Sequence, residues 1–402
     1  MANLKFLLIP LLSLSGVGFL TDLPWYKVEH DKVVNNKEEV CFVENLVCRA
    51  DSLKYEQIDE ILHKAFDAGR FNGQVLYAED GKILYNKSFG YENLKTKKEL
   101  TNASVFQLAS TSKPFTAIAI LKLQEAGKLQ IDMPVIFYLP DFPYKEVSVK
   151  NLLQHRSGLP NYINIADAHW PKSIPLTNQD LTPLLRKYVK NLVFTPDSRF
   201  QYSNTNYAYL ATIVEKVSGK TFANYMQDEI FTPLGMQHSF IYDASTKNNQ
   251  DAVIGYDWSR RIGFFERPCD FLDGVVGDKG IYSTAEDLYL FDQALYDYSL
   301  ISEKSLDAAF TPAVPFDEKH SRDYGLGFRV KKNTDGQNIA YHNGWWKGFR
   351  TFYVHDYQNK KTLIWLNNRS DVTVTPYMNS ILENSGDTNE ENTIQGDFGS
   401  KE

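Results

Sequence analysis

The chain has few cysteines and no cysteine or histidine pattern typical of a metal site. Cys41, Cys48 and Cys269 are too few among 402 residues to staple a disulfide scaffold, so ordinary burial must hold the core. Cys41 and Cys48 are close enough in sequence to bridge in an oxidising compartment, and two unrelated buried thiols are the alternative. Neither His-Glu-x-x-His nor paired Cys-x-x-Cys occurs, so no metal and no cofactor are expected.

Concentrated positive charge is also missing. The chain carries 43 Lys+Arg against 50 Asp+Glu, a formal net charge of −7 at pH 7. Proteins that bind nucleic acid usually cluster positive charge against the phosphates, so a nucleic-acid partner is not expected. Hydrophobic residues make up 43% and aromatic residues 14%, which excludes a disordered or fibrous chain and favours a globular one.

The apolar run at the N-terminus is too short for a typical membrane-spanning helix. Residues 6–20 follow Lys5 and are interrupted by Pro10, two serines and two glycines, whereas a spanning helix needs about 20 apolar residues. Small residues at 16–18 complete the pattern of an export signal. An uncleaved membrane anchor is the alternative, and a buried first helix is a weaker one. Export places the protein in the periplasm or outside the cell, with membrane contact only through this segment.

Hydrophobic periodicity predicts strands at both ends of the chain and helices between them. Helices are expected at 53–71, 116–126, 207–217 and 285–296. Strands are expected at 74–78, 83–85, 327–330, 350–354 and 362–366. Asp80-Gly81 supplies the turn between the first two strands.

This arrangement predicts an α+β fold. An antiparallel sheet built from N- and C-terminal segments is flanked by helices, and a mostly helical lobe is inserted at about 111–283, with the site in the cleft between lobes. The predicted segments are the signal or anchor (1–20), an N-terminal extension (21–52), the main domain (53–383) and a polar, disordered tail (384–402).

Ser110-Thr111-Ser112-Lys113 lies just before a helical run. Positions i and i+3 of a helix share a face, so Lys113 can reach the Ser110 hydroxyl, and free N–H groups at a helix start can stabilise an oxyanion. The alternative is a simple N-cap serine followed by a solvated lysine. The spacing predicts a nucleophile with its base, although the pattern alone has little specificity.

Tyr202-Ser203-Asn204 precedes another helical run. The same Tyr-x-Asn spacing also begins at Tyr91, Tyr162 and Tyr357. Tyr202 is preferred because Phe-Thr-Pro precedes it and a Ser-Asn-Thr-Asn turn follows, which predicts an ordered loop entering a helix. A structural tyrosine is the alternative.

His342-Asn343-Gly344 is the only His-x-Gly in the chain, and Trp345 and Trp346 follow it. A strand glycine has no side chain, so Gly344 would let a substrate backbone approach closely. Taken singly, His342 is equally compatible with a structural or surface histidine.

In this order, the three motifs resemble those of serine hydrolases of the β-lactamase and penicillin-binding-protein type, most closely the class C-like branch that includes esterases and D-amino-acid peptidases. Two further segments fit: 153–160, together with Leu152 before it, resembles L-x-x-H-x-S-G-L, and 280–288 resembles G-x-x-S-T-x-x-D-L. The resemblance covers about Leu53 to Asn368 and implies that the main domain is a β-lactamase-related hydrolase.

The resemblance also implies roles for individual residues. Ser110 attacks, Lys113 and Tyr202 handle protons, and Asn204 orients both substrate and Lys113. Backbone N–H groups of Ser110 and Trp345 would form the oxyanion hole, while His342 and Gly344 would contact substrate. Because free tyrosine and lysine titrate near pH 10, the two must perturb each other to act as a base at neutral pH.

Two departures from the family pattern concern substrate and loop geometry. No Lys-[Ser/Thr]-Gly occurs, so His342 replaces the lysine that typically contacts the carboxylate of β-lactams and D-Ala peptides, which weakens anion recognition. The adjacent tryptophans favour an apolar or aromatic group. Pro196-Asp197 stands where relatives often have Pro-Gly, so that loop is expected to differ.

These observations predict an exported serine hydrolase that forms an acyl-enzyme on Ser110 and hydrolyses an ester or amide of a small-molecule or peptide substrate. Esterase or D-amino-acid peptidase-like activity ranks above efficient β-lactamase activity because of His342. The alternative is a catalytically idle binding protein for cell-wall peptides or a partner. An intact Ser110, Lys113 and Tyr202 count against it, because binding does not require all three.

Overall fold

The computed structural model describes residues 37–242, 252–315, 322–333 and 336–382, with side chains described from residue 51 onward. The chain divides into two compact units, 1–50 and 51–402, and the site lies in the second. The predicted export segment and polar tail lie outside the described residues, as do the side chains of Cys41 and Cys48. Within the described part, no helix is both long and apolar enough to cross a membrane.

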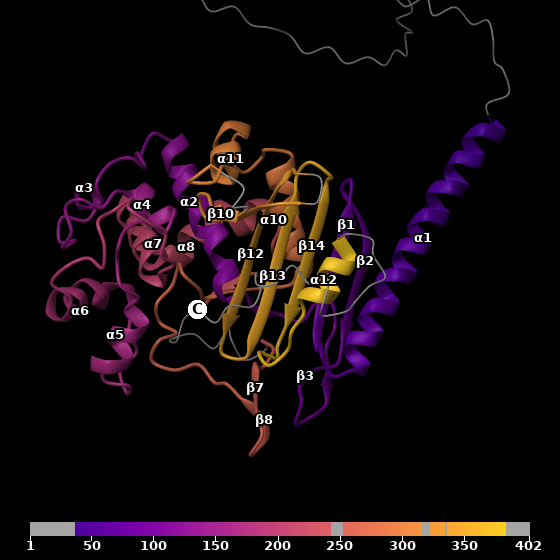
Figure 1. The fold of residues 1–402 in the computed structure, drawn as a ribbon, viewed down its shortest axis with the longest axis horizontal. Helices are drawn as coiled ribbons and strands as arrows, with labels where there is room; N and C mark the ends of the chain where they lie inside the picture. Colours follow the sequence, from indigo (N-terminus) through magenta and orange to yellow (C-terminus); the bar gives the residue numbers. More distant parts are fainter. Residues whose placement is uncertain (1–36, 243–251, 316–321, 334–335, 383–402) are drawn as a thin grey trace, which may run out of the picture. The chain divides into compact units, whose positions relative to one another are not determined.

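The centre of the second unit is an antiparallel sheet that combines both ends of the domain (Figure 1). In the described residues its strand order is β10 (Arg322–Tyr324), β11 (Arg329–Lys332), β12 (Asn338–Trp346), β13 (Phe349–Asp356), β14 (Lys361–Asn367), β1 (Gly73–Glu79) and β2 (Lys82–Phe89). The N-terminal hairpin therefore pairs with the last strand of the chain, which confirms the predicted α+β sheet.

Helices cover both faces of this sheet. The α-helices are α1 (Lys37–Asp67), α2 (Lys113–Glu125), α3 (Val135–Tyr138), α4 (Val149–Leu153), α5 (Tyr162–His169), α6 (Leu181–Tyr188), α7 (Asn204–Ser218), α8 (Phe222–Met226), α9 (Thr232–Leu234), α10 (Ala285–Tyr296), α11 (Glu303–Phe310) and α12 (Thr375–Leu382). Short 3₁₀ or π turns are η1 (Ala109–Ser112), η2 (Asn178–Asp180) and η3 (Gln227–Phe231).

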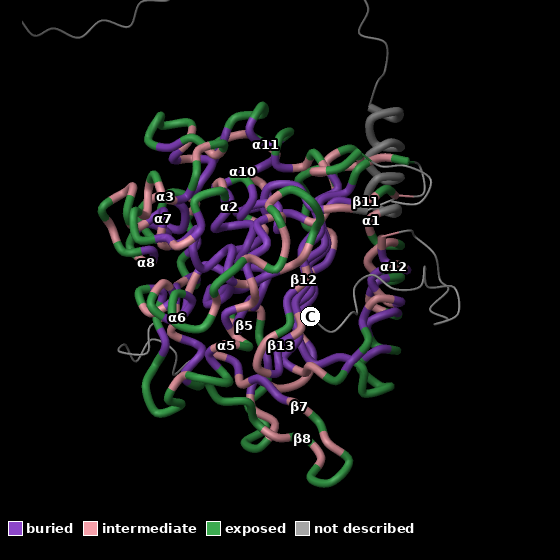
Figure 2. Tube along the Cα trace, turned by 60° about the vertical axis from the view of Figure 1, so that its left-hand side comes forward, coloured by how far each residue is buried: buried purple, intermediate pink, exposed green. Residues whose placement is uncertain are grey.

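Alternation along the strands separates two cores. In β14, Leu363 and Trp365 face a core shared with α12 and the second half of α1, whereas Ile364 and Leu366 face the larger core shared with the helical lobe. Successive side chains of a strand point to opposite faces of the sheet. A strand whose residues are apolar in succession is therefore buried on both faces. Figure 2 shows this buried chain concentrated around β12 and β13 and an exposed rim at the β7–β8 hairpin.

The lobe between β2 and β10 is mostly helical but carries small strands as well. These are β3 (Tyr91–Asn93), β4 (Lys98–Glu99), β5 (Phe106–Gln107), β6 (Phe240–Ile241), β7 (Tyr256–Ser259), β8 (Gly263–Glu266) and β9 (Ile281–Ser283). Strand β9 pairs with β5 on one side and with β6 on the other, which connects the segment before η1 to the segment before α10. This small sheet holds both segments at the site described below.

Element boundaries differ from prediction where tertiary contacts or local propensity decide them. Helix α1 begins at Lys37 rather than at residue 53, because 37–52 contains neither proline nor glycine. It ends at Asp67, before Gly69 takes the left-handed conformation (φ +65°). Strand β11 begins two residues late because Gly327 lies against α2, where a Cβ would come 2.2 Å from the Ala117 side chain.

The predicted hairpin turn is confirmed. Asp80 and Gly81 have φ of +48° and +73°, the left-handed pair that a two-residue turn between right-twisted strands requires.

Candidate active site

Ser110 lies in the turn η1, directly before helix α2. The residue before it, Ala109, is buried with φ +51°, a strained value for a non-glycine residue. Thr351 on β13 holds this turn, because its Oγ1 donates to the Leu108 carbonyl at 2.7 Å. The Thr111 and Thr351 hydroxyls also meet at 2.9 Å. The nucleophile candidate is therefore fixed by the central sheet and not by its own helix alone.

Lys113 is the first residue of α2 and is fully buried. Its Nζ donates to Ser110 Oγ at 2.9 Å, to Asn204 Oδ1 at 2.8 Å and to the Asp278 backbone oxygen at 2.8 Å. These three acceptors are uncharged, and one of them is the serine hydroxyl. Once the amine is neutral, the same 2.9 Å contact allows it to accept the Ser110 proton.

The structure brings Tyr202 to this lysine. The Tyr202 ring centroid lies 4.8 Å from Lys113 Nζ, and Asn204, two residues later, opens α7 and accepts from the same ammonium. By contrast, Tyr162 lies at the start of α5 and contacts Lys279 instead. The geometry therefore favours Tyr202 among the Tyr-x-Asn candidates.

The segment 153–160 supports the Tyr202 loop from the side opposite the nucleophile. His155 Nδ1 accepts from the Ser203 backbone N–H at 3.2 Å and from Asn206 Nδ2 at 2.9 Å, so its proton is on Nε2. The ring packs on Tyr202 with centroids 4.3 Å apart. Ser157 Oγ donates to Asn206 Oδ1 at 2.6 Å. This motif positions the loop and does not line the pocket.

Asp197 keeps the backbone conformation that glycine would favour. Its φ is +66°, which aspartate tolerates better than most side chains. Asn151 Nδ2 donates to Asp197 Oδ1 at 2.8 Å, and the Asp197 N–H donates to the Arg156 carbonyl at 2.9 Å. These bonds hold Asp197 in the left-handed conformation, so in this respect the expected difference from the Pro-Gly loop is small.

Gly344 serves the turn at Ser110 rather than the pocket. A Cβ at this position would lie 2.3 Å from the Leu108 carbonyl oxygen and 2.3 Å from Thr351 Oγ1. Strand β12 can therefore approach η1 only because residue 344 lacks a side chain. The backbone that approaches Gly344 here is that of the segment leading into η1, and Gly344 is not among the residues that line the pocket, so contact of Gly344 with substrate stays a prediction.

His342 is buried and both of its ring nitrogens have partners. Nδ1 donates to the Asn343 carbonyl at 2.8 Å, and Nε2 accepts from the Tyr324 hydroxyl at 3.0 Å. Burial, followed by the charges of Arg329 and Lys113, holds the pKa of His342 well below its ordinary value. The ring is neutral and does not line the pocket, so the geometry gives no support to the predicted contact with substrate.

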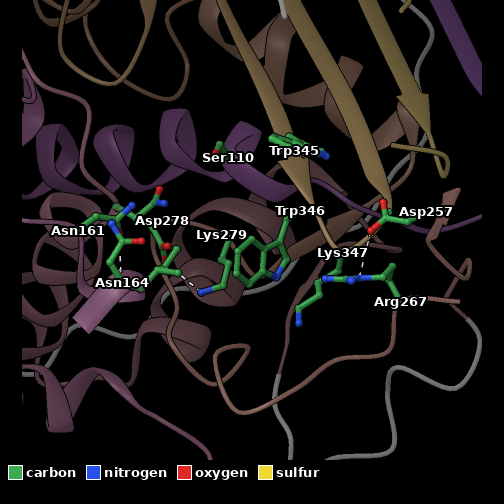
Figure 3. Close-up of a pocket in the computed structure, with 13 residues that line it drawn as sticks. Ser110, Asn161, Asn164, Asp257, Arg267, Asp278, Lys279, Trp345, Trp346 and Lys347 are labelled. Atoms are coloured by element: carbon green, nitrogen blue, oxygen red, sulfur yellow. Dashed lines mark hydrogen bonds and ion pairs between the residues drawn. The ribbon is translucent and has the colours of Figure 1, made fainter. Parts of the chain in front are cut away.

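A pocket of about 250 Å³ opens beside Ser110 (Figure 3). Among the described residues its lining is Ser110, Asn161, Ile163, Asn164, Asn204, Asp257, Arg267, Asp278, Lys279, Trp345, Trp346, Lys347 and Gly348. Three of the sequence-predicted residues, Ser110, Asn204 and Trp345, therefore share this pocket. Lys113 lies behind the lining and contacts Ser110 and Asn204, and Tyr202 contacts Lys113.

Sequence reasoning missed a buried charged pair in the pocket wall. Lys279 and Asp278 are 3% and 1% exposed and form an ion pair at 3.6 Å. Lys279 Nζ donates to the Tyr162 hydroxyl at 2.6 Å, and that hydroxyl donates to Asp278 Oδ2 at 3.1 Å. Burial, then the Asp278 charge, raises the pKa of Tyr162 well above its ordinary value. The signal in the sequence was an Asp-Lys pair directly before the 280–288 motif.

A serine in contact with a buried lysine, at the junction of a helical lobe and an antiparallel sheet, defines a serine hydrolase of the lysine-assisted type. Residues 58–380 match the family model described as Beta-lactamase, and the chain belongs to this family of serine hydrolases.

Relatives agree with this assignment. The chain is 36% identical over 340 residues to penicillin-binding protein 4* of Bacillus subtilis (strain 168), covering 82% of this chain and 75% of that protein. It is 27% identical to teichoic acid D-alanine hydrolase of Staphylococcus aureus (strain NCTC 8325 / PS 47), covering 85% and 81%. The octameric penicillin-binding protein homologue from Pyrococcus abyssi superposes with a TM-score of 0.72 at 26% identity, covering 81% and 76%.

Replacing Gly344 by alanine tests the support of the nucleophile turn. The new Cβ must push back the Leu108 carbonyl, and a displacement of about 1 Å can cost about 10²-fold in rate. We expect kcat/KM for a neutral aryl ester to fall by about that factor while the protein still folds. Gly219→Ala is the control: open space surrounds Gly219, but its φ is +73°, so only stability should fall, by about 1 kcal/mol. Wild-type activity in Gly344→Ala would contradict the proposal that Gly344 makes room for the turn that carries Ser110.

We expect the buried histidines His155 and His342 to make the folded protein less stable in acid. Burial is the main cause that lowers the pKa of both below 6.5 in the folded state. Their contribution is complete above pH 6.5 and declines as pH falls, because only the unfolded chain takes up the proton. Each histidine should lower the free energy of unfolding by up to about 1.4 kcal/mol per pH unit below 6.5.

Urea unfolding at pH 7.5 and 5.5 measures this effect. The His342→Gln variant, which cannot titrate, should lose less stability between the two pH values than the wild-type protein does. An equal loss in both proteins would show that His342 does not resist protonation.

Proposed function

We propose that the protein is an exported serine hydrolase that forms an acyl-enzyme on Ser110 and hydrolyses an ester or amide of a D-amino acid. The observation that carries the proposal is the 2.9 Å contact between Lys113 Nζ and Ser110 Oγ, made by a lysine that is fully removed from water. A structural serine does not need a buried amine as its partner.

The reaction would proceed in two halves. Ser110 Oγ attacks the substrate carbonyl carbon while its proton passes to the Lys113–Tyr202 pair. The resulting oxyanion is stabilised by backbone N–H groups, for which Ser110 and Trp345 remain the candidates. Collapse breaks the bond to the leaving group, which receives the proton. Water then attacks the acyl-enzyme by the same path, releasing the acid and restoring the serine.

The preference for D-amino-acid substrates is supported by relatives and by the pocket. Teichoic acid D-alanine hydrolase is, by its name, an enzyme that removes D-alanine. The pocket of about 250 Å³ suits a small acyl group. The site of the family's carboxylate-binding lysine holds a buried, neutral His342 with both nitrogens occupied, which argues against efficient recognition of the carboxylate of a β-lactam.

Export is part of the proposal and is supported by the sequence pattern of residues 6–20. Anchoring through the same segment is the alternative, and either arrangement would place the enzyme at the cell envelope. A catalytically idle binding protein remains the contrasting function. The close packing of Ser110, Lys113 and Asn204 argues against it, because binding alone does not require a serine activated by an amine.

Labelling with a fluorophosphonate tests the nucleophile and its activation together. The reagent should attach to Ser110, as located by peptide mass spectrometry, and labelling should be lost in Lys113→Ala because the base is gone. Thermal unfolding of the variant controls for folding. Labelling at another residue, or none on the wild-type protein, would refute the catalytic proposal.

Tyr202→Phe removes the hydroxyl and keeps the ring that packs on His155. We expect kcat for an aryl ester to fall by about 10² to 10⁴, the usual range for general acid–base catalysis. Tyr207→Phe is the matched control, because its ring lies 5.8 Å from Lys113 Nζ but its hydroxyl donates to the Leu153 carbonyl. Should Tyr162→Phe abolish turnover while Tyr202→Phe does not, the proton-handling tyrosine is Tyr162.

A further inference from the structure

The wall of the pocket opposite the tryptophans contains a carboxylate that is incompletely satisfied. Asp278 is 1% exposed, and its Oδ2 accepts from the Tyr162 hydroxyl at 3.1 Å. Its Oδ1 has no hydrogen-bond partner among the described residues and is approached by Lys279 Nζ only at 3.6 Å. A buried carboxylate oxygen without a hydrogen bond is costly, which points to a ligand that supplies the donor.

The position of Asp278 relative to the nucleophile is fixed by its own backbone. The Asp278 carbonyl accepts from Lys113 Nζ at 2.8 Å, and the same Nζ donates to Ser110 Oγ at 2.9 Å. Asp278 and Ser110 both line the pocket, and Figure 3 shows Asp278 between Asn164 and Lys279. A group that contacts this carboxylate therefore lies in the same pocket as the nucleophile.

Lys279 is poorly placed to bind an anion from the substrate. Its Nζ already donates to the Tyr162 hydroxyl at 2.6 Å and to the Val275 carbonyl at 3.1 Å, and it forms the ion pair with Asp278. An ammonium has three N–H donors, so a substrate carboxylate would have to displace one of these partners. The group of this wall that lacks a hydrogen bond is therefore an acceptor, Asp278 Oδ1, and not a donor.

Charge in and around the pocket agrees with this. Asp270 pairs with Lys347, Asp257 pairs with Arg267 at 3.3 Å, and Asp273 Oδ1 accepts from Trp346 Nε1 at 2.6 Å. Among the residues that line the pocket, Asp257 and Asp278 pair with Arg267 and Lys279, and Lys347 pairs with Asp270 just outside the lining. Each cation of the described lining therefore already has a carboxylate partner, so an anionic group of the substrate would have to compete with that partner.

We infer that Asp278 is a specificity-determining residue that binds the free ammonium group of a D-aminoacyl substrate through Oδ1. The inference rests on the proposed function and narrows it: the acyl group delivered to Ser110 carries an unmodified α-amino group, as a D-alanyl ester or amide does. Substrates whose amino group is acylated lose this contact, and a substrate carboxylate at the same place would lie against the Asp278 carboxylate.

Two substrates that differ only in the ammonium test the inference, D-alanine p-nitroanilide and N-acetyl-D-alanine p-nitroanilide. The specificity ratio is kcat/KM for the free amine divided by kcat/KM for the acetylated compound. Because hydrogen bonds between charged groups are the stronger ones, Asp278→Asn should lower this ratio at least tenfold. Asp257→Asn is the matched control, since it removes another carboxylate of the pocket, and its ratio should stay within about twofold of wild type.

The pH dependence of the wild-type ratio gives a test that needs no variant. An α-amino group loses its proton near pH 8, so the ratio should fall as pH rises through that value, because the neutral amine no longer pairs with Asp278. A ratio that is flat between pH 6 and 9.5, or that rises, would overturn the inference even if Asp278→Asn fails to fold.

If both substrates are turned over too slowly to measure, their binding can be compared by how well related amides protect Ser110 from the fluorophosphonate. D-alaninamide should protect Ser110 at a concentration at least tenfold lower than N-acetyl-D-alaninamide. Equal protection, with Ser110 still labelled in their absence, would overturn the role of Asp278 while leaving the acyl-enzyme proposal intact. Failure of Ser110 to label at all would instead refute the proposed function.

Discussion

The site depends on one buried ammonium group. Removing the charge of Lys113 from water is expensive unless oxygens replace the water, and three elements provide them: the turn η1 through Ser110, helix α7 through Asn204, and the segment before β9 through the Asp278 carbonyl. These elements are far apart in sequence. The lysine therefore links the nucleophile, the Tyr202 loop and the pocket wall, and a shift in any of them would leave the charge unsatisfied.

The rest of the lobe and sheet hold those three elements in place. Ala109 has a strained φ of +51° next to the nucleophile, a conformation that costs about 1 to 3 kcal/mol and persists only where neighbours enforce it. Thr351 bonds to the Leu108 carbonyl, and Gly344 gives β12 room beside the same turn. On the other side His155 holds the Ser203 N–H and packs on Tyr202. The family motifs that flank the nucleophile are thus mainly supports for its position.

The proposed recognition of substrate uses a different set of residues. A polar cluster at the pocket wall consists of Asp278, Lys279 and Tyr162. By contrast, both ring nitrogens of His342 form hydrogen bonds within the protein. In the proposed mechanism, attack at the carbonyl uses Ser110 and Lys113 and can be common to the family. Recognition of the acyl group can change separately, since the side chain of Asp278 faces the pocket while only its backbone holds the lysine.

The sequence by itself determined the α+β class, the hairpin at Asp80-Gly81 and the pairing of Ser110 with Lys113, because these follow from local periodicity, turn dihedrals and a spacing of three residues. It could not determine that His342 is buried with both nitrogens occupied, that Gly344 makes room for η1, or that Tyr162 meets Lys279 across 117 residues. Those outcomes depend on which side chains the sheet and lobe bring together. Only the tertiary structure sets such contacts, since no local pattern encodes the partner of a residue distant in sequence.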